Sequence, residues 1–230
     1  MVRWKPMLGS VGAIACFATS AGAAGDPLVQ VSRDQLCVTD GEVSTDTNGA
    51  LSVAAPAMRA VVPAASRQDV EARFAYLGPT DQTVALGSGA IREQFGLKLR
   101  AVDPCNLVYA MWRFAPKAGV VVQLKRNPDA HDSQACGNNG YQDVYPSFSR
   151  AVAAPGVGRR HRLKAEMEAS TLKVSVDGKL VWRGEVAGAP ADGPVGIRSD
   201  NAKLALILFA PLGSSPIGAA PPHCRPSGAD

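Results

Sequence analysis

Runs of alternating apolar and polar residues make up most of the chain beyond residue 50. In the run 69–77, Val70, Ala72, Phe74 and Tyr76 fall on one face of an extended strand. Successive side chains of a strand point to opposite faces, so this alternation predicts a strand with one buried face. No window of the sequence shows a sustained helical period. The pattern therefore predicts a protein built from many short strands joined by turns.

Three consecutive runs, at 95–102, 107–114 and 120–125, are separated by short segments with the composition of turns. Tight turns join neighbouring antiparallel strands, whereas parallel strands need a long crossover. We therefore expect an antiparallel meander with Phe95 and Leu97 facing the core.

The stretch 163–209 contains the clearest pattern. Alternating runs surround Asp177 and Gly178, a pair that is typical of hairpin turns because glycine adopts positive φ freely. A three-residue loop at 177–179 is expected, since it pairs Val176 with Leu180 and Val174 with Trp182 and buries Trp182. A two-residue loop, the alternative, places Lys179 and Val181 on that face instead. The last run, 204–209, is apolar on both faces, which suits a strand covered on both sides; a buried helix is the alternative.

The segments LKVSVDGKLVWRGEV, at 172–186, and GPVGIRSDNAKLALILF, at 193–209, resemble the end of a concanavalin A-like jelly roll. This superfamily includes lectin-type, laminin G-like, glucanase and 3-keto-disaccharide hydrolase-like domains. The resemblance implies an all-β sandwich of two antiparallel sheets. Many domains with this fold only bind, and others catalyse different reactions. The Glu-x-Asp-x-x-Glu run of glucanases with this fold is absent, and so is the arginine-rich strand motif with Gln-x-His of jelly-roll alginate lyases.

The first 24 residues have the pattern of a signal peptide. Arg3 and Lys5 precede an apolar stretch at 7–17 that is too short to span a bilayer, and small residues follow at 20–25. We therefore expect cleavage near residue 24, export to the periplasm or the cell exterior, a sandwich domain at 25–210 and a tail at 211–230. A lipoprotein signal ending at Cys16 is the alternative.

Charge is close to balance in the predicted mature chain. Removing Arg3 and Lys5 from the 24 basic residues leaves 22 against 20 acidic ones, a net charge of +2. This balance indicates neither a nucleic acid nor an anionic membrane as partner.

Four cysteines remain after the predicted signal peptide, which fits an oxidising compartment. Three pairings are possible. We expect Cys105–Cys136, which closes a loop of hairpin size, and Cys37–Cys224, which joins the two ends of the domain and ties down the tail. A zinc site is the alternative, but the chain has no Cys-x-x-Cys and few histidines. We predict no metal and no cofactor.

Two groups of polar and aromatic residues are candidate binding sites. The first is a long loop at 126–149 with groups suited to sugar recognition: Asp129, His131, Asp132, Asn138, Asn139, Tyr141, Asp143 and Tyr145. The second is the polar face of the meander: Lys98, Arg100, Tyr109, Arg113, Gln123 and Lys125. From these two groups we select as ligand-binding residues Lys98, Arg100, Tyr109, Arg113, Lys125, His131, Asn138, Tyr141 and Tyr145. A solvated loop and an ordinary solvated sheet face are the competing interpretations.

Asp200 and Asn201 follow a short strand, where they form either a β-turn or an oxygen-donor calcium site. Three functions fit the sequence. The first is carbohydrate binding without catalysis, with a glycan or polysaccharide as partner. The second is a glycoside hydrolase or a polysaccharide lyase that acts on an acidic glycan. The third is a structural or interaction module without a small ligand.

Overall fold

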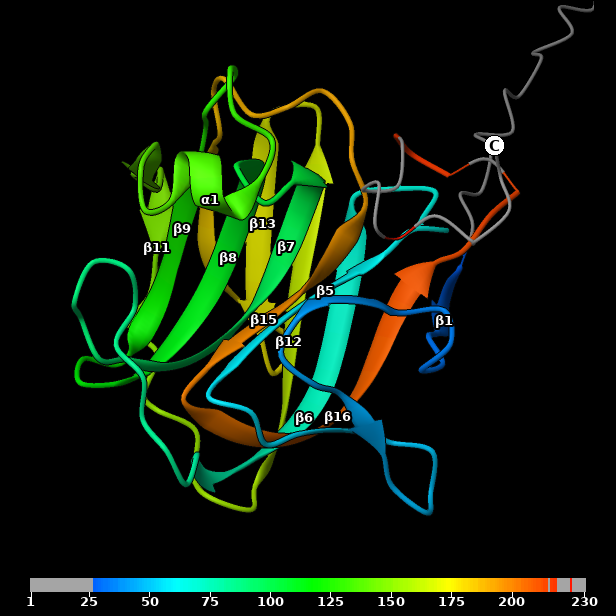
Figure 1. The fold of residues 1–230 in the computed structure, drawn as a ribbon, viewed down its shortest axis with the longest axis vertical. Helices are drawn as coiled ribbons and strands as arrows, with labels where there is room; N and C mark the ends of the chain where they lie inside the picture. Colours follow the sequence, from blue (N-terminus) through cyan, green and yellow to red (C-terminus); the bar gives the residue numbers. More distant parts are fainter. Residues whose placement is uncertain (1–26, 215, 219–223, 225–230) are drawn as a thin grey trace, which may run out of the picture.

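Two antiparallel β-sheets pack face to face in the computed structural model, which describes residues 27–214, 216–218 and 224 (Figure 1). The first sheet has the order β11-β14-β13-β12-β6-β16-β4-β3, with β1 paired to β16, and the second the order β10-β9-β8-β7-β15-β5-β2. The expected all-β sandwich of two antiparallel sheets is confirmed. Among the described residues, no helix is long and apolar enough to cross a membrane.

The nine-stranded sheet is formed by strands from both ends and the middle of the chain: β1 (Leu28–Gln30), β3 (Ser44–Thr45), β4 (Leu51–Val53), β6 (Asp69–Pro79), β11 (Phe148–Ser149), β12 (Arg160–Glu168), β13 (Thr171–Val176), β14 (Lys179–Glu185) and β16 (Ala202–Pro211). The seven-stranded sheet contains β2 (Cys37–Asp40), β5 (Ala57–Val62), β7 (Glu93–Asp103), β8 (Asn106–Ala115), β9 (Gly119–Lys125), β10 (Tyr141–Val144) and β15 (Val195–Asp200). The helix α1 spans Ser133–Cys136.

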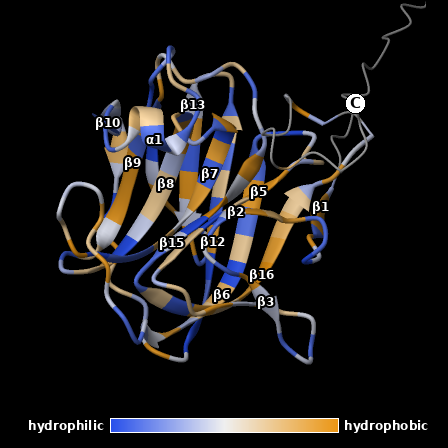
Figure 2. Ribbon diagram, viewed as in Figure 1, coloured by the Kyte–Doolittle hydropathy of each residue, from blue (hydrophilic) through white to orange (hydrophobic). Residues whose placement is uncertain are grey.

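The core fills the space between the sheets. Apolar and polar residues alternate along many of the strands that enclose it (Figure 2). Phe74 of β6 packs against Phe95 of β7 at 4.9 Å between ring centroids and against Trp112 of β8 at 5.7 Å. These rings come from both sheets, so burying them holds the two layers together. The expected meander is confirmed, since β7, β8 and β9 are antiparallel neighbours.

The hairpin at Asp177 differs from its prediction in one respect. Val174 pairs with Trp182 and Trp182 is buried, as expected, but Val176 pairs with Lys179 rather than with Leu180. The loop therefore has two residues, and the register shifts beyond it, between Val174 and Ser175. A β-bulge adds one residue to one strand of a pair. Here the extra residue is on β14, between Leu180 and Trp182, and it brings Trp182 to the buried face although the turn has only two residues.

The segment 126–149, predicted as one long loop, contains regular structure. Helix α1 is capped by Asp132, whose carboxylate accepts hydrogen bonds from the backbone N–H groups of Gln134 and Ala135, both at 2.9 Å. Strand β10 then adds to the edge of the seven-stranded sheet, and β11 adds to the edge of the other. Edge strands are short and polar here, which is why the segment resembles a loop in sequence.

Both expected disulfides are confirmed. Cys105–Cys136 has a Cα–Cα distance of 5.8 Å, and Cys37–Cys224 has one of 5.6 Å. Strand β16 ends at Pro211, and the bond to Cys37 holds Cys224 against the seven-stranded sheet. The predicted signal peptide, with its alternative at Cys16, lies outside the described residues.

Candidate functional site

Outward-facing side chains of the seven-stranded sheet form rows that run across the strands. In one row Tyr109 pairs with Lys98, and Lys98 pairs with Gly196. In the next row Gly96 pairs with Arg198, and Arg198 pairs with Arg59. Strand alternation places these residues opposite core positions such as Leu97 and Ile197. The register of antiparallel pairing therefore gathers polar groups from four strands on one face.

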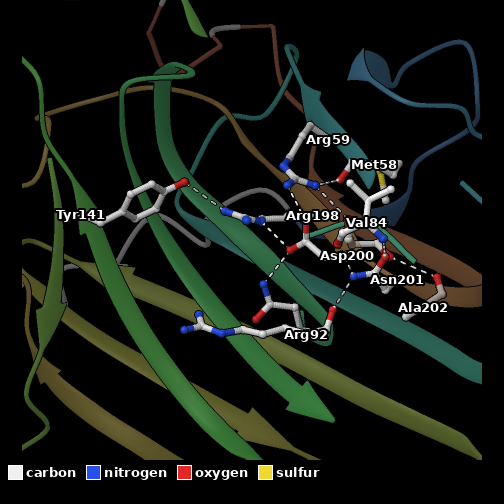
Figure 3. A network of polar contacts seen from close by, with 11 residues as sticks. Met58, Arg59, Val84, Arg92, Tyr141, Arg198, Asp200, Asn201 and Ala202 are labelled. Carbon is white, nitrogen blue, oxygen red and sulfur yellow. Dashed lines mark hydrogen bonds and ion pairs between the residues drawn. The ribbon is translucent and has the colours of Figure 1, made fainter. Parts of the chain in front are cut away.

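Two arginines hold a single carboxylate at the centre of this face (Figure 3). Asp200 accepts hydrogen bonds from Arg59 Nη2 at 2.5 Å, from Arg198 Nε at 2.9 Å and from Gln94 Nε2 at 2.6 Å. Burial opposes ionisation of Asp200, but the charges of Arg198 and Arg59 outweigh it and lower its pKa. The Asp200 carboxylate therefore stays ionised and has no role as a proton donor near neutral pH.

Two tyrosines lie beside this cluster. The guanidinium of Arg198 donates a hydrogen bond to the hydroxyl of Tyr141 at 3.1 Å and lies 4.8 Å from the ring centroid of Tyr109. The two tyrosine rings stack, with centroids 6.0 Å apart. Burial raises the pKa of Tyr109 to about 12. For Tyr141, burial acts in the same direction, but the nearby cations Arg198 and Lys125 prevail and lower its pKa.

Lys98 is a buried cation on the same face. Lys98 is only 4% exposed, and its side chain forms no hydrogen bond or ion pair with any residue that the structure describes. Burial lowers the pKa of Lys98 to about 7, and the charges of Arg59 and Arg198 act in the same direction.

One wall of the site is the segment that carries α1. The disulfide Cys105–Cys136 joins this segment to the turn between β7 and β8. Lys125 donates a hydrogen bond from Nζ to the carbonyl of Gly137 at 2.9 Å, and its Nζ lies 5.0 Å from the ring centroid of Tyr141. The wall is therefore fixed to the sheet by one covalent bond and by the lysine.

The opposite wall is the segment 84–92, which a single buried asparagine holds in place. The amide of Asn201 accepts a hydrogen bond from the N–H of Val84 at 2.8 Å and donates to the carbonyls of Val84 and Arg92 at 2.9 and 3.0 Å. Asn201 has a φ of 52° in the short link between β15 and β16, a conformation that asparagine tolerates. Asn201 thus connects the link between β15 and β16, which passes from one sheet to the other, to the segment 84–92.

Two adjacent cavities, of about 310 and 360 Å³, lie on this face. The segment with α1 lines both, the segment 84–92 lines only the smaller one, and Thr39 and Asp40 border the larger one. Both are lined by Arg59, Gly137 and Tyr141, so we treat them as the two halves of one groove. The amide half, about 310 Å³, includes Gln94, Gln123 and Asn138 in its lining. The lysine half, about 360 Å³, is lined by Thr39, Asp40, Lys98, Asp103, Tyr109 and Lys125, among others. These volumes are at the lower end of small-molecule sites, roughly 300–1,000 Å³.

The structure brings together five of the nine predicted binding residues, since the groove is lined by Lys98, Tyr109, Lys125, Asn138 and Tyr141. His131 lies near it, where its Nδ1 is 2.8 Å from Oδ2 of Asp103. Arg113 shares the outward face through its pairing with Gln94, but it does not line either cavity.

Two predicted residues lie away from the groove. Tyr145 is 86% exposed beyond β10. Arg100 has a φ of 48° at the start of a register shift in β7, and its guanidinium donates hydrogen bonds to the carbonyls of Ala169 and Pro190. Strand alternation fails at Arg100 because the positive φ turns its side chain out of the row that contains Lys98.

The central residues Arg59, Gln94 and Arg198 are not among the residues predicted from the sequence. Arg59 is the one polar residue of the otherwise apolar strand β5, while Gln94 and Arg198 each stand next to a core residue, Phe95 and Ile197, in β7 and β15. A polar residue beside core positions in a strand is the signal that could have revealed them. Asp200 was considered only as a turn residue or a calcium ligand. Its oxygens are instead held by Arg59, Arg198 and Gln94, and the described residues contain no group of three or more His, Cys, Asp and Glu side chains suited to a metal ion.

No model of a known protein family matches the sequence, and no curated protein matches it. Among solved structures, a carbohydrate-binding module, CBM66, from Bacillus subtilis is similar, with 15% identity over 75% of this chain and 91% of that chain and a TM-score of 0.51. The carbohydrate recognition domain of Emp46p, in a potassium-bound form, is 14% identical over 76% of this chain and 87% of its own, with a TM-score of 0.47. The galectin LEC-6 from Caenorhabditis elegans is 11% identical over 78% of this chain and 97% of its own, with a TM-score of 0.42.

At such identities, similarity establishes the fold alone. The fold is a concanavalin A-like jelly roll, as the sequence pattern at 172–209 had indicated.

Proposed function

We propose that the protein is an exported carbohydrate-binding protein without catalytic activity, and that the groove is its binding site. The observation that carries this proposal is a buried, unused hydrogen-bond acceptor in the amide half. Gln94 is 2% exposed, and its Oε1 has no hydrogen-bond partner within the described part of the chain. A buried polar atom without a partner costs about 1–3 kcal/mol, and a sugar hydroxyl entering the groove would supply the missing donor.

The groove also contains the other groups that sugar recognition uses. Amide groups of Gln123 and Asn138 and the guanidinium of Arg59 line it together with the ring of Tyr141. Planar hydrogen-bonding groups bind sugar hydroxyls, and a tyrosine ring offers an apolar face to the C–H groups of a pyranose. The carbohydrate-binding module from Bacillus subtilis has the same fold, which fits this proposal.

The absence of catalysis is proposed from the state of the carboxylates. Glycoside hydrolysis generally needs two carboxyl groups across the substrate, one of which is protonated. Asp200 is ionised between two arginines. Asp103 accepts hydrogen bonds from the Asn106 side chain and from the N–H of Cys105 at 2.7 Å. Within the described lining this leaves Asp40, which is exposed, as a single carboxylate without such partners.

Export is proposed from the pattern of residues 1–24 together with the two disulfides. Disulfide bonds form and persist in oxidising compartments and are rare in a reducing cytosol. Two bonds that join distant parts of one domain fit a protein that folds outside the cytoplasm.

Affinity electrophoresis and a glycan array test the proposal. We expect retention on at least one polysaccharide, and we expect Tyr141→Ala to weaken binding about tenfold or more, because it removes a ring that lines both halves of the groove. Tyr145→Ala is the matched control, since this exposed tyrosine lies outside the groove and its loss should leave binding unchanged.

Two results would contradict the proposal. Binding to no glycan, or equal losses in the two tyrosine variants, would remove the groove as a carbohydrate site. Release of new reducing ends or of unsaturated sugars from a bound polysaccharide would show that the protein is an enzyme.

A further inference from the structure

Lys98 is a cation with no partner inside the lysine half of the groove. Its side chain is more than nine-tenths buried and lines the cavity, yet it contacts no described carboxylate within ion-pair distance. We propose that this lysine binds an anionic group of the ligand, a carboxylate or a sulfate, so that the protein recognises an acidic polysaccharide. This inference rests on the proposed carbohydrate-binding function and names the class of glycan.

The neighbouring charges do not neutralise Lys98. Arg59 is paired with Asp200, and Lys125 donates its hydrogen bond to Gly137. Of the two other carboxylates in the lining, Asp103 is bound to Asn106, Cys105 and His131, while Asp40 is exposed at the rim. The lysine half therefore presents an excess of positive charge at its buried end.

An acidic sugar would supply the hydrogen-bond acceptors and the negative charge that the buried Lys98 lacks. An ammonium has three N–H donors, and burying it without acceptors is costly unless an opposite charge is supplied. The oxygens of a carboxylate or sulfate provide both acceptors and charge, and such charge-assisted hydrogen bonds are stronger than neutral ones. Tyr109, which pairs with Lys98 across β7 and β8, lines the same half of the groove.

The two halves of the groove then differ in what they bind. Gln94 in the amide half lacks a donor, which a neutral hydroxyl supplies. Lys98 in the lysine half lacks an anion. Since Tyr141 lines both halves, a glycan chain lying across it would place hydroxyls in one half and an acidic group in the other.

The state of Lys98 makes the interaction depend on pH. Its pKa is lowered to about 7 by burial, with Arg59 and Arg198 acting in the same direction and Asp40 against them. The ammonium is the charged form below this pKa, so affinity for an acidic glycan should be high below pH 7 and fall as pH rises. Burial also lowers the pKa of Lys125, so deprotonation of Lys125 would act in the same direction.

The test compares binding of the full chain to uronate polymers (polygalacturonate, alginate and hyaluronan), sulfated polymers (dextran sulfate and chondroitin sulfate) and neutral polymers (β-glucan, arabinan and levan). We expect Lys98→Met to weaken binding to acidic polymers about tenfold or more and to leave binding to neutral ones unchanged. Lys173→Met is the matched control, because it removes the same charge from an exposed position on the other sheet. A preference for uronates or for sulfated polymers identifies the anionic group.

A pH series gives a second readout that does not depend on the folding of the variant. In the wild-type chain and in His131→Gln, which removes the imidazole paired with Asp103, affinity for acidic polymers should fall as pH rises through about 7. Lys98→Met should lose the fall in affinity near pH 7.

The outcomes separate the two proposals. Binding to neutral polymers alone, or acidic binding that Lys98→Met and high pH leave unchanged, would overturn the inference and leave the carbohydrate-binding proposal intact. Equal losses in Lys98→Met and Lys173→Met would indicate nonspecific attraction and would also overturn it. Binding to no polymer in the panel would overturn both.

Discussion

The outward faces of the two sheets follow the same alternation but place their charges in different surroundings. On the nine-stranded sheet, Lys164 and Glu166 form an ion pair at 2.6 Å with side chains 29% and 43% exposed. On the seven-stranded sheet, Asp200 pairs with Arg198 at 2.9 Å, and these side chains are 2% and 9% exposed. The first pair is partly exposed to solvent, whereas the second is buried beneath the groove.

The difference comes from what covers each face. The segment with α1 and the segment 84–92 both line the groove on the seven-stranded sheet, and Cys224 packs beside Val61. Alternation determines which face a side chain occupies, but added segments determine whether water reaches it. Buried and exposed ion pairs differ in energy for this reason, because only the buried pair has lost its hydration.

Removing the central carboxylate should produce the largest difference between the two faces. Asp200→Ala leaves Arg59 and Arg198 buried without their counter-charge, so we expect a loss of about 3–5 kcal/mol in the free energy of unfolding. Glu166→Ala on the other face should cost about 0–1 kcal/mol. Urea denaturation measures both values, and equal losses would contradict the comparison.

The pH dependence of stability sharpens the same contrast. Since the folded protein lowers the pKa of Asp200, this group stabilises the fold above its unfolded pKa, about 3.9, and the stabilisation is lost as pH falls. The stability difference between wild type and Asp200→Ala should therefore shrink in acid. A constant stability difference from pH 7 to pH 2 would contradict a lowered pKa of Asp200 in the folded protein.

Opening one wall of the groove should have the next largest effect. Replacing both Cys105 and Cys136 with alanine removes a cross-link between residues 31 apart in sequence, which on the loop-entropy model stabilises the fold by about 4 kcal/mol. We expect amide hydrogen exchange to accelerate at 126–140 and to remain slow in the hairpin at 163–176, the internal control on the other sheet. Equal acceleration in both regions would show that the bond does not act locally.

Releasing the other wall should have the smallest effect of the three. Asn201→Gly keeps the positive φ accessible but removes the three side-chain hydrogen bonds to Val84 and Arg92, so we expect a loss of about 1–3 kcal/mol and faster exchange at 84–92. Asn201→Ala should lose about 1–2 kcal/mol more, because alanine is strained at this φ. An unchanged exchange rate at 84–92 would contradict the anchoring role.

Much of the fold could be predicted from local pattern. Alternation identified the meander and the buried faces of β6 and β7, and the run at 204–209 became strand β16 of the nine-stranded sheet. The disulfide pairings were also correct, because one closes a short excursion and the other joins the ends of the domain. These features depend on neighbours in sequence or on general geometry.

The predictions from the sequence were wrong where a single residue changes the pairing register of a strand or the direction of its side chain. The bulge beside Val174 allows a two-residue turn and a buried Trp182 together, whereas strict alternation made them alternatives. The positive φ of Arg100 moves its side chain from the groove to the carbonyls of Ala169 and Pro190. A period of two carries no information on such insertions, since each reverses the faces that follow it.

The sequence by itself determined the long strands and their buried faces, since these follow from side-chain period, and it limited the four cysteines to three pairings. Only the tertiary structure decided which polar residues share a site. Arg59, Gln94 and Arg198 come from three strands, and antiparallel register between distant segments brings them to Asp200. The burial of Lys98 depends on walls contributed by other parts of the chain. Contacts between residues far apart in sequence leave no local pattern, and the groove consists of such contacts.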